Sequence, residues 1–173
     1  MTHKFKRTRF FCQFHSPAGT LTLCAGIYGL MEVSWHKHSI KHNNHPILKL
    51  AMKQLEEYFE GKRERFDLPL EMNASSFQKC IWKTLQDIPY GETIGYAELA
   101  KKAGFQKAFR AVGSACGQNP LPIIIPCHRV ISSDGSLGGF SGKLAIKKFL
   151  LNLEGKKIKF IQTLRKPLNS LAK

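Results

Sequence analysis

The sequence predicts an α+β N-terminal domain (a small antiparallel sheet plus a helix), followed by a mostly α, helix-turn-helix (winged-helix-like) C-terminal domain. Short alternating segments bounded by turn residues predict strands within residues 10–35. Apolar residues at helical spacing dominate from Pro46 onward. Hydrophobic residues make up 43% of the 173 positions, so the chain can bury a core and an intrinsically disordered basic protein is disfavoured. We expect domains at 1–72 and 73–155 and a basic tail at 156–173.

Three short strands and one helix are expected in the first domain. The segment 21–24 alternates inward and outward positions, as a half-buried strand does. Similar segments lie on both sides of it, so that strands are expected at 10–14, 21–24 and 30–35, with turns at 16–19 and 26–29. A helix should run from Pro46 to Gly61, because proline favours a helix start and glycine a helix end. The polar residues 62–74 are expected to form a linker.

Helices are expected to dominate the second domain. Ser75 or Ser76 can cap a helix with an apolar stripe, and the turn at 89–91 ends it. Two short helices should follow, the first capped by Thr93 and the second over 107–116. Two such helices joined by a glycine-containing turn are typical of a helix-turn-helix, although an ordinary αα-hairpin fits the same pattern.

A rigid segment and a final helix complete the expected fold. Prolines flank the apolar run at 120–131, which disfavours a helix there. Residues 133–136 read Ser-Asp-Gly-Ser, a sequence that predicts a hairpin. Ser141 can cap a last helix that ends near Gly155.

The charge indicates a polyanionic partner. The chain has 27 Lys+Arg and 12 Asp+Glu, a net charge of +15, and the segment 156–173 has six basic and no acidic residues. Such a tail suits DNA, RNA or an anionic membrane, although it can also be a solvated segment that keeps the protein in solution. No apolar run approaches the length of a membrane span, and the N-terminus does not resemble a signal peptide. We therefore expect an intracellular protein that is not secreted.

One of the five cysteines has the surroundings of a nucleophile. Cys127 lies in the proline-stiffened segment and is followed directly by His128 and Arg129. Basic neighbours lower the pKa of a thiol, and a rigid backbone fixes the position of its sulfur. The alternative is a buried cysteine beside two surface residues. The odd number of cysteines and the lack of a CxxC pair favour reduced thiols.

The segment around this cysteine carries a resemblance to a known family. The sequence Pro-Cys-His-Arg-Val at 126–130, preceded by Asn119-Pro120, resembles the active-site signature of the O6-alkylguanine-DNA alkyltransferases, also called methylated-DNA–protein-cysteine methyltransferases. Residues 89–100 resemble the first helix-turn-helix element of that family, and 110–113 its recognition helix. Ser141-Gly142 and Glu154-Gly155 resemble its C-terminal element. The resemblance covers residues 76–155, and the N-terminal unit is similar to the variable first domain of the family.

The resemblance implies a DNA-repair enzyme that acts by direct reversal. An alkyl group on O6 of guanine, and by extension on O4 of thymine, is transferred irreversibly to Cys127 in a single turnover. The implied partner is double-stranded DNA containing the alkylated guanine, which is flipped from the helix. A monomer without a cofactor or a membrane partner is expected. It should be cytoplasmic in a prokaryote and nuclear in a eukaryote.

The resemblance also assigns residues to roles. The implied catalytic group comprises Cys127 as nucleophile, His128 as its base through a bound water, Glu154 as the residue that orients the histidine, and Tyr96 as proton donor to the guanine.

The implied substrate and DNA contacts have distinct tasks. Arg110 fills the gap left by the flipped base, and Asn119 organises the turn beside the nucleophile. Ser141 and backbone groups near Val130 contact the guanine, and Arg129 and Phe140 also belong to this set. Phe140 stands where many relatives have tyrosine, so the hydrogen bond of that hydroxyl is lost here.

No metal is expected. The histidines near Trp35 fit none of the usual zinc spacings; they are His36, His38, His42 and His45. Two other function classes remain open on the residues alone. One is a DNA-binding module without chemistry, and the other is a thiol hydrolase that uses Cys127 and His128.

Overall fold

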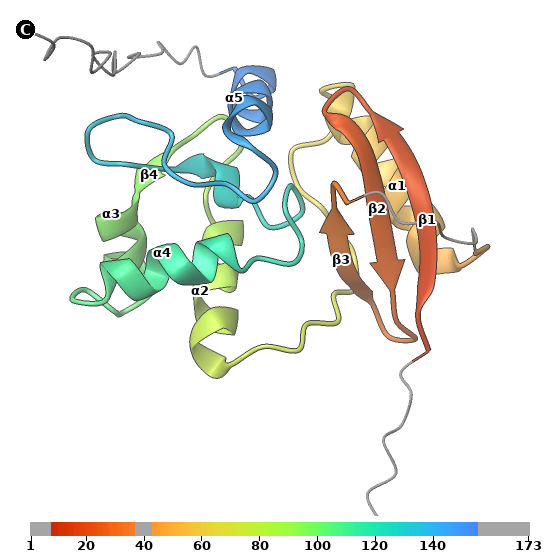
Figure 1. The fold of residues 1–173 in the computed structure, drawn as a ribbon, viewed down its shortest axis with the longest axis horizontal. Helices are drawn as coiled ribbons and strands as arrows, with labels where there is room; N and C mark the ends of the chain where they lie inside the picture. The colour runs from red at the N-terminus through yellow and green to blue at the C-terminus, as the bar shows by residue number, and fades with distance from the viewer. Residues whose placement is uncertain (1–7, 37–42, 156–173) are drawn as a thin grey trace, which may run out of the picture.

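The N-terminal part is a three-stranded antiparallel sheet with one helix on its face. The computed structural model describes residues 8–36 and 43–155. The strands are β1 (Phe10–Ser16), β2 (Gly19–Ala25) and β3 (Leu30–Ser34), in the order β1-β2-β3. The helix α1 (Pro46–Phe59) packs against the sheet and buries Leu48 and Leu55 (Figure 1). The predicted strands and helix are confirmed.

The segment expected as a linker also contributes to the sheet. The backbone N–H of Leu30 donates to the carbonyl of Pro69 at 2.8 Å, and the N–H of Glu71 donates to the carbonyl of Leu30 at 2.9 Å. The side-chain amide of Gln54 makes two further bonds, one to the N–H and one to the carbonyl of Asp67, at 2.9 and 2.7 Å. This connection is therefore held against both β3 and α1.

The C-terminal part is mostly helical. It contains α2 (Ser76–Gln86), α3 (Tyr96–Lys102), α4 (Phe109–Gly117) and α5 (Leu144–Leu153). Ser75 caps α2 through a capping box with Gln78, as its position predicted. The pair α3 and α4 forms the expected helix-turn-helix, beside α2 (Figure 1).

Two predicted caps are wrong. Thr93 does not cap α3, because Ile94–Gly95 is the short strand β4, which pairs in parallel with β5 (Val130–Ile131). The helix starts only after this ladder. Ser141 does not cap α5, which begins two residues after Gly142; its N-cap is Lys143, with a left-handed φ of 75°.

The predicted hairpin at 133–136 forms only as a turn. The N–H of Ser132 donates to the carbonyl of Ser136 at 2.9 Å. The partner of β5 in the described sheet is β4, so no antiparallel strand follows the turn.

The two parts share a continuous buried cluster. Leu23 and Tyr58 of the sheet and α1 belong to the same cluster as Trp82, Leu99 and Val130. In residues 8–36 and 43–155, no helix has the length and apolar character of a transmembrane segment. The predicted basic tail at 156–173, and also His38 and His42, lie outside the described residues.

Candidate active site

The turn that carries Cys127 is fixed by the side chain of Asn119. Its Nδ2 donates to the carbonyl of Ile125 at 2.8 Å and to Sγ of Cys127 at 3.2 Å, while its Oδ1 accepts from the N–H of Leu121 at 2.9 Å. Ile123, a β-branched residue, has a left-handed φ of 77°, which isolated chains avoid. Packing and the hydrogen bonds of Asn119 therefore hold Ile123 in an unfavourable backbone conformation. The same contacts fix the position of the sulfur of Cys127.

The thiol is buried between opposing electrostatic influences. Cys127 is 6% exposed, and burial raises its pKa, whereas the hydrogen bond from Asn119 and the charge of Lys147 lower it. Lys147 is itself fully buried on α5, and its Nζ donates to the carbonyls of Val130, at 2.6 Å, and Leu137. Burial lowers the pKa of Lys147 to about 8. This lysine was not predicted as a site residue, because in the sequence it only interrupts an apolar helix face.

The histidine after Cys127 pairs with the predicted acid. Nε2 of His128 lies 2.8 Å from Oε1 of Glu154, and both side chains are fully buried. Burial lowers the pKa of His128, so the ring is neutral near pH 7. An ionised Glu154 accepts from Nε2–H, which leaves the lone pair on Nδ1. Nδ1 has no hydrogen-bond partner among the described residues, so it can accept a proton.

Glu154 is the hub of this buried network. Its carboxylate accepts from the hydroxyl of Tyr58 at 2.7 Å, from Nε and Nη2 of Arg129 at 2.9 and 3.0 Å, and from the N–H of Gly91 at 3.2 Å. Burial alone would raise the pKa of Glu154, but the hydrogen bonds and charges of His128 and Arg129 outweigh it and lower this pKa to about 2. Tyr58 and Gly91 were not predicted as site residues.

Glycine is required at position 91. A Cβ there would lie 2.8 Å from the carbonyl oxygen of Glu154, and φ is +74°. The 89–91 turn can thus approach the end of α5 this closely only because glycine at position 91 has no side chain.

Arg129 does not fit the predicted contact with substrate or DNA. It is 4% exposed, and its Nη1 donates to the carbonyl of Ile88 at 2.6 Å while the rest of the guanidinium faces Glu154. Since a cation is buried here only when it is paired, its position suits orientation of Glu154.

A cavity of about 340 Å³ opens beside Cys127. It brings together Cys127 and three of the predicted residues, Tyr96, Phe140 and Ser141. Cys116, which was not predicted, also lines it. Burial raises the pKa of Tyr96, so its hydroxyl remains protonated and can donate. Arg110 does not line this cavity and is exposed near the start of α4.

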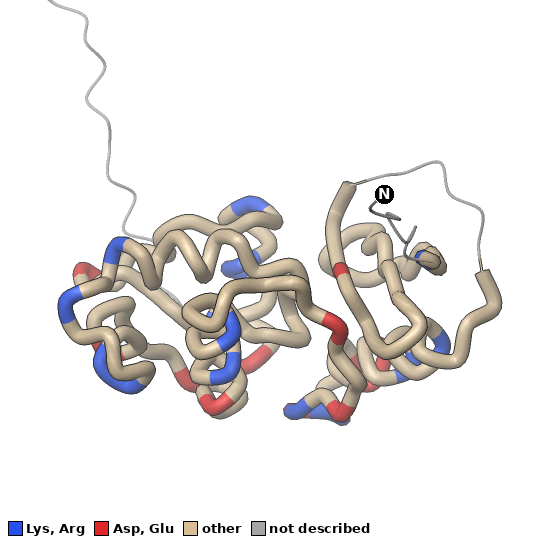
Figure 2. The backbone as a smooth tube through the Cα atoms, turned by 90° about the horizontal axis from the view of Figure 1, so that it is seen from below, with Lys and Arg blue, Asp and Glu red and all other residues tan. Residues whose placement is uncertain are grey.

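The outer surface near α4 carries basic residues. Lys101, Lys102, Lys107 and Arg110 are all exposed. Figure 2 shows Lys and Arg at the end of the helical part that lies farthest from the sheet. In the described part of the chain, no group of three His, Cys, Asp or Glu side chains is placed to hold a metal ion.

The sequence matches two related family descriptions. Residues 76–156 match "6-O-methylguanine DNA methyltransferase, DNA binding domain", and residues 11–72 match "6-O-methylguanine DNA methyltransferase, ribonuclease-like domain". The chain belongs to the 6-O-methylguanine DNA methyltransferase family. The resemblance inferred from the segment at 126–130 is thereby confirmed.

Relatives in this family align with more than two thirds of the chain. A methylated-DNA–protein-cysteine methyltransferase of Methanosarcina acetivorans is 43% identical over 153 residues, 84% of this chain and 98% of the relative. A constitutive enzyme of that name from Bacillus subtilis is 46% identical over 125 residues, 70% and 76% of the two chains.

Solved structures of the family have the same fold. The O6-methylguanine methyltransferase of Mycobacterium tuberculosis has a TM-score of 0.77 at 37% identity, over 85% of this chain and 93% of that one. A structure of M. tuberculosis OGT in complex with DNA has a TM-score of 0.76 at 40% identity, over 84% and 92%. The predicted fold class is confirmed.

Proposed function

We propose that the protein is a DNA-repair methyltransferase that moves the alkyl group from O6 of a guanine in DNA to Sγ of its own Cys127. The observation that carries the proposal is the cavity in which this sulfur faces the same space as Tyr96 and Ser141. His128, the residue after Cys127 in the sequence, forms a buried pair with Glu154. Family membership supports this reaction over a thiol hydrolase.

The transfer begins with removal of the thiol proton, since the thiolate is the nucleophile. Nδ1 of neutral His128 takes this proton through a bound water, and the carboxylate of Glu154 stabilises the imidazolium that results. The hydrogen bond from Nδ2 of Asn119 and the positive charge of Lys147 stabilise the thiolate that forms. Arg129 serves as a positioning residue that keeps Glu154 ionised and fixed.

The alkyl carbon is then transferred from O6 to the sulfur in one displacement. The C–S bond forms as the C–O6 bond breaks, and the electron pair stays with the guanine. The hydroxyl of Tyr96 donates a proton to the base, and the proton held by His128 restores the balance through solvent. Ser141 and the backbone near Val130 orient the guanine, and Phe140 supplies an apolar wall. A thioether does not release the group again, so each molecule acts once and needs no cofactor.

Duplex DNA must open for this reaction. The cavity of about 340 Å³ accepts a base but not a double helix, so the guanine leaves the stack. Arg110 enters the gap, where its planar guanidinium stacks. The exposed side of α4 carries Ala111, Ser114 and Gly117, which let the helix approach the minor groove closely. Minor-groove contacts read sequence poorly, which suits a protein that scans all DNA.

Further parts of the proposal concern scope and organisation. O4-alkylthymine is a second substrate, and the protein acts as a monomer on double-stranded DNA. Residues 1–72 and 73–155 are its two domains, and the tail at 156–173 tethers it to phosphates. The protein is located with DNA, in the cytoplasm of a prokaryote or the nucleus of a eukaryote; the relatives described above are bacterial and archaeal.

The test uses an oligonucleotide duplex that contains O6-methylguanine. After incubation, the intact mass of the protein should rise by one methylene, and peptide mapping should assign it to Cys127. The Cys127→Ser variant should gain nothing, whereas Cys24→Ser, which changes a buried thiol of the sheet, should react as the parent does. A folded parent protein that binds this duplex but gains no mass is a DNA-binding module, and the proposal is then wrong.

A further inference from the structure

Trp35 links the sheet to the segment that forms the outer wall of the active-site cavity. The residue follows β3, and its Nε1 donates to the carbonyl of Ala18 in the β1–β2 turn at 3.0 Å. Its ring meets the ring of Phe140 edge-on, with centroids 5.8 Å apart and planes at 65°. Trp35 thus contacts two turns that are far apart in the sequence.

The same ring lies against the backbone of Gly142. A Cβ at this position would be 2.6 Å from Cζ3 and 2.8 Å from Cε3 of Trp35, closer than such contacts occur. The φ of Gly142 is not left-handed, so glycine is needed here for space and not for conformation. The indole therefore fixes how far the segment 140–142 can move toward the sheet.

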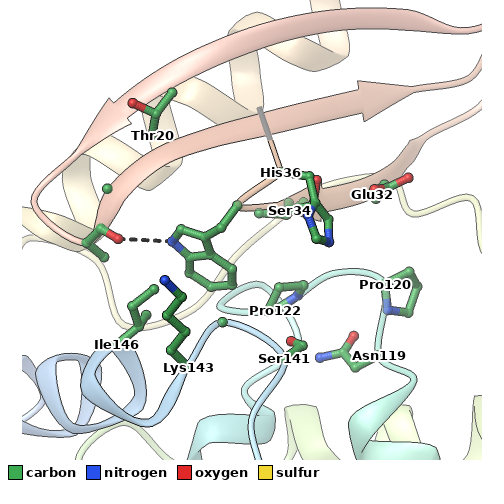
Figure 3. A pocket seen from close by; sticks show the side chains of 15 residues that line it. Thr20, Glu32, Ser34, His36, Asn119, Pro120, Pro122, Ser141, Lys143 and Ile146 are labelled. Atoms are coloured by element: carbon green, nitrogen blue, oxygen red, sulfur yellow. Dashed lines mark hydrogen bonds between the residues drawn. The ribbon is translucent and has the colours of Figure 1, made fainter. Parts of the chain in front are cut away.

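The opposite side of that segment faces the chemistry. Phe140 and Ser141 line the cavity that contains Cys127. A second, larger cavity of about 670 Å³ lies on the sheet side; Ser141 and Lys143 border it from the helical part, and Thr20 and Ser34 border it from the sheet (Figure 3). The wall between the two spaces has no regular secondary structure, so it depends on contacts for its position.

We propose that Trp35 is a positioning residue for alkyl transfer: its indole holds residues 140–142 at the distance from Cys127 that a flipped guanine requires. The inference rests on the proposed function, in which Ser141 contacts the guanine. The hydrogen bond to Ala18 fixes the plane of the ring, and the ring transmits the position of the sheet to the wall. The N-terminal part thereby contributes to transfer without touching the substrate.

The first experiment compares two reactions of the same thiol. Trp35→Ala should slow transfer from an O6-methylguanine duplex, and from free O6-benzylguanine, by about tenfold, because a small misplacement of a positioning group has effects of this size or larger. Alkylation of Cys127 by iodoacetamide should not slow, since this reagent does not need the wall. Trp35→Phe, which keeps a ring but lacks the Nε1 donor, should recover most of the transfer rate.

Tyr28→Ala is the matched control, because Tyr28 is an aromatic residue of the turn between β2 and β3 and is 80% exposed. It should leave both reactions unchanged. A Trp35→Ala protein that transfers at the parent rate overturns the inference, and so does one in which both reactions fall together, because general loss of structure explains that result. If the parent protein itself transfers nothing, the proposed function fails instead.

A second experiment tests the contact itself. Gly142→Ala should slow transfer in the parent, because the added methyl group pushes the segment away from Trp35. The same change should cost less in the Trp35→Ala background, because the clash with the indole is removed and only the approach to Cε1 of Phe140, at 2.9 Å, remains. The two substitutions should therefore not be additive. Equal slowing in both backgrounds contradicts a direct contact between this ring and the wall.

Discussion

Replacement of Glu154 by glutamine is expected to destabilise the protein strongly. The substitution keeps the shape of the side chain but removes the charge that pairs with buried Arg129 and His128. The pKa of this carboxyl falls from 4.5 to about 2 in the folded protein. Each pKa unit corresponds to about 1.4 kcal/mol, so the charge contributes about 3 kcal/mol of folding free energy at pH 7. A similar cost is typical when one partner of a buried ion pair is removed.

The pH dependence follows from the sign of the shift. Because the pKa of Glu154 is lower in the folded state, its contribution is complete above pH 4.5 and is lost as the pH falls toward 2. The lowered pKa of His128 acts in the same direction, and its contribution begins to decrease below the ordinary value of 6.5. The parent protein should therefore lose stability on acidification, and Glu154→Gln should lose less of it below pH 4.5.

Urea and thermal unfolding, followed by circular dichroism at pH 7, 5 and 3, measure both effects. At pH 7 the variant should melt about 6–12 °C below the parent, the range expected for about 3 kcal/mol in a chain of this size. Glu60→Gln is the matched control, since Glu60 pairs with Lys62 at the surface, and its midpoint should not change measurably. Equal stability of Glu154→Gln and the parent at pH 7 would refute the reasoning.

Four other substitutions test the site. Asn119→Ala removes a donor to the sulfur, and Lys147→Met removes a nearby positive charge; each should raise the pKa of Cys127, and the pH profile of iodoacetamide labelling should move to higher pH. An unchanged profile in both variants would contradict the electrostatic account. Tyr58→Phe removes one donor to a buried carboxylate and should lower the unfolding free energy by about 2 kcal/mol, as chemical denaturation can show. Arg110→Ala should slow transfer from duplex DNA more than from free O6-benzylguanine; equal slowing argues against a role in base flipping.

The rigid turn around Cys127 could be predicted from the sequence because its residues are close together in the chain. Prolines restrict the backbone around Cys127, and Asn119 needs to reach only a few residues to bond this turn. The partners of Glu154 could not be predicted in the same way. The hydroxyl of Tyr58 contacts a residue 96 positions later, and in the sequence this tyrosine is only one member of the apolar stripe of α1.

The missed features of the fold have a similar physical origin. Thr93 has the chemistry of a helix cap, but Ile94 is extended because it pairs with Val130, so a long-range ladder overrides the local preference. Lys147 interrupts an apolar face, and a charged side chain is by itself unsuited to burial, yet this one is fully buried. Two backbone carbonyls accept hydrogen bonds from its Nζ, and the positions of these carbonyls are set by segments outside α5. Such acceptors are invisible in a one-dimensional pattern.

The distribution of donors around Glu154 also has a consequence for synthesis of the protein. The N-terminus of a chain leaves the ribosome first, so Cys127 emerges before Glu154, which completes the buried network. Until α5 docks, His128 lacks its acidic partner. The hydroxyl of Tyr58 likewise lacks its acceptor, the carboxylate of Glu154, which lies 96 positions later in the chain. On the proposed mechanism, the network that activates Cys127 is therefore complete only when the last described helix is in place. An incomplete nascent chain carries the cysteine without the rest of the network, so the proposed single alkyl transfer could not be used up before the protein is able to bind DNA.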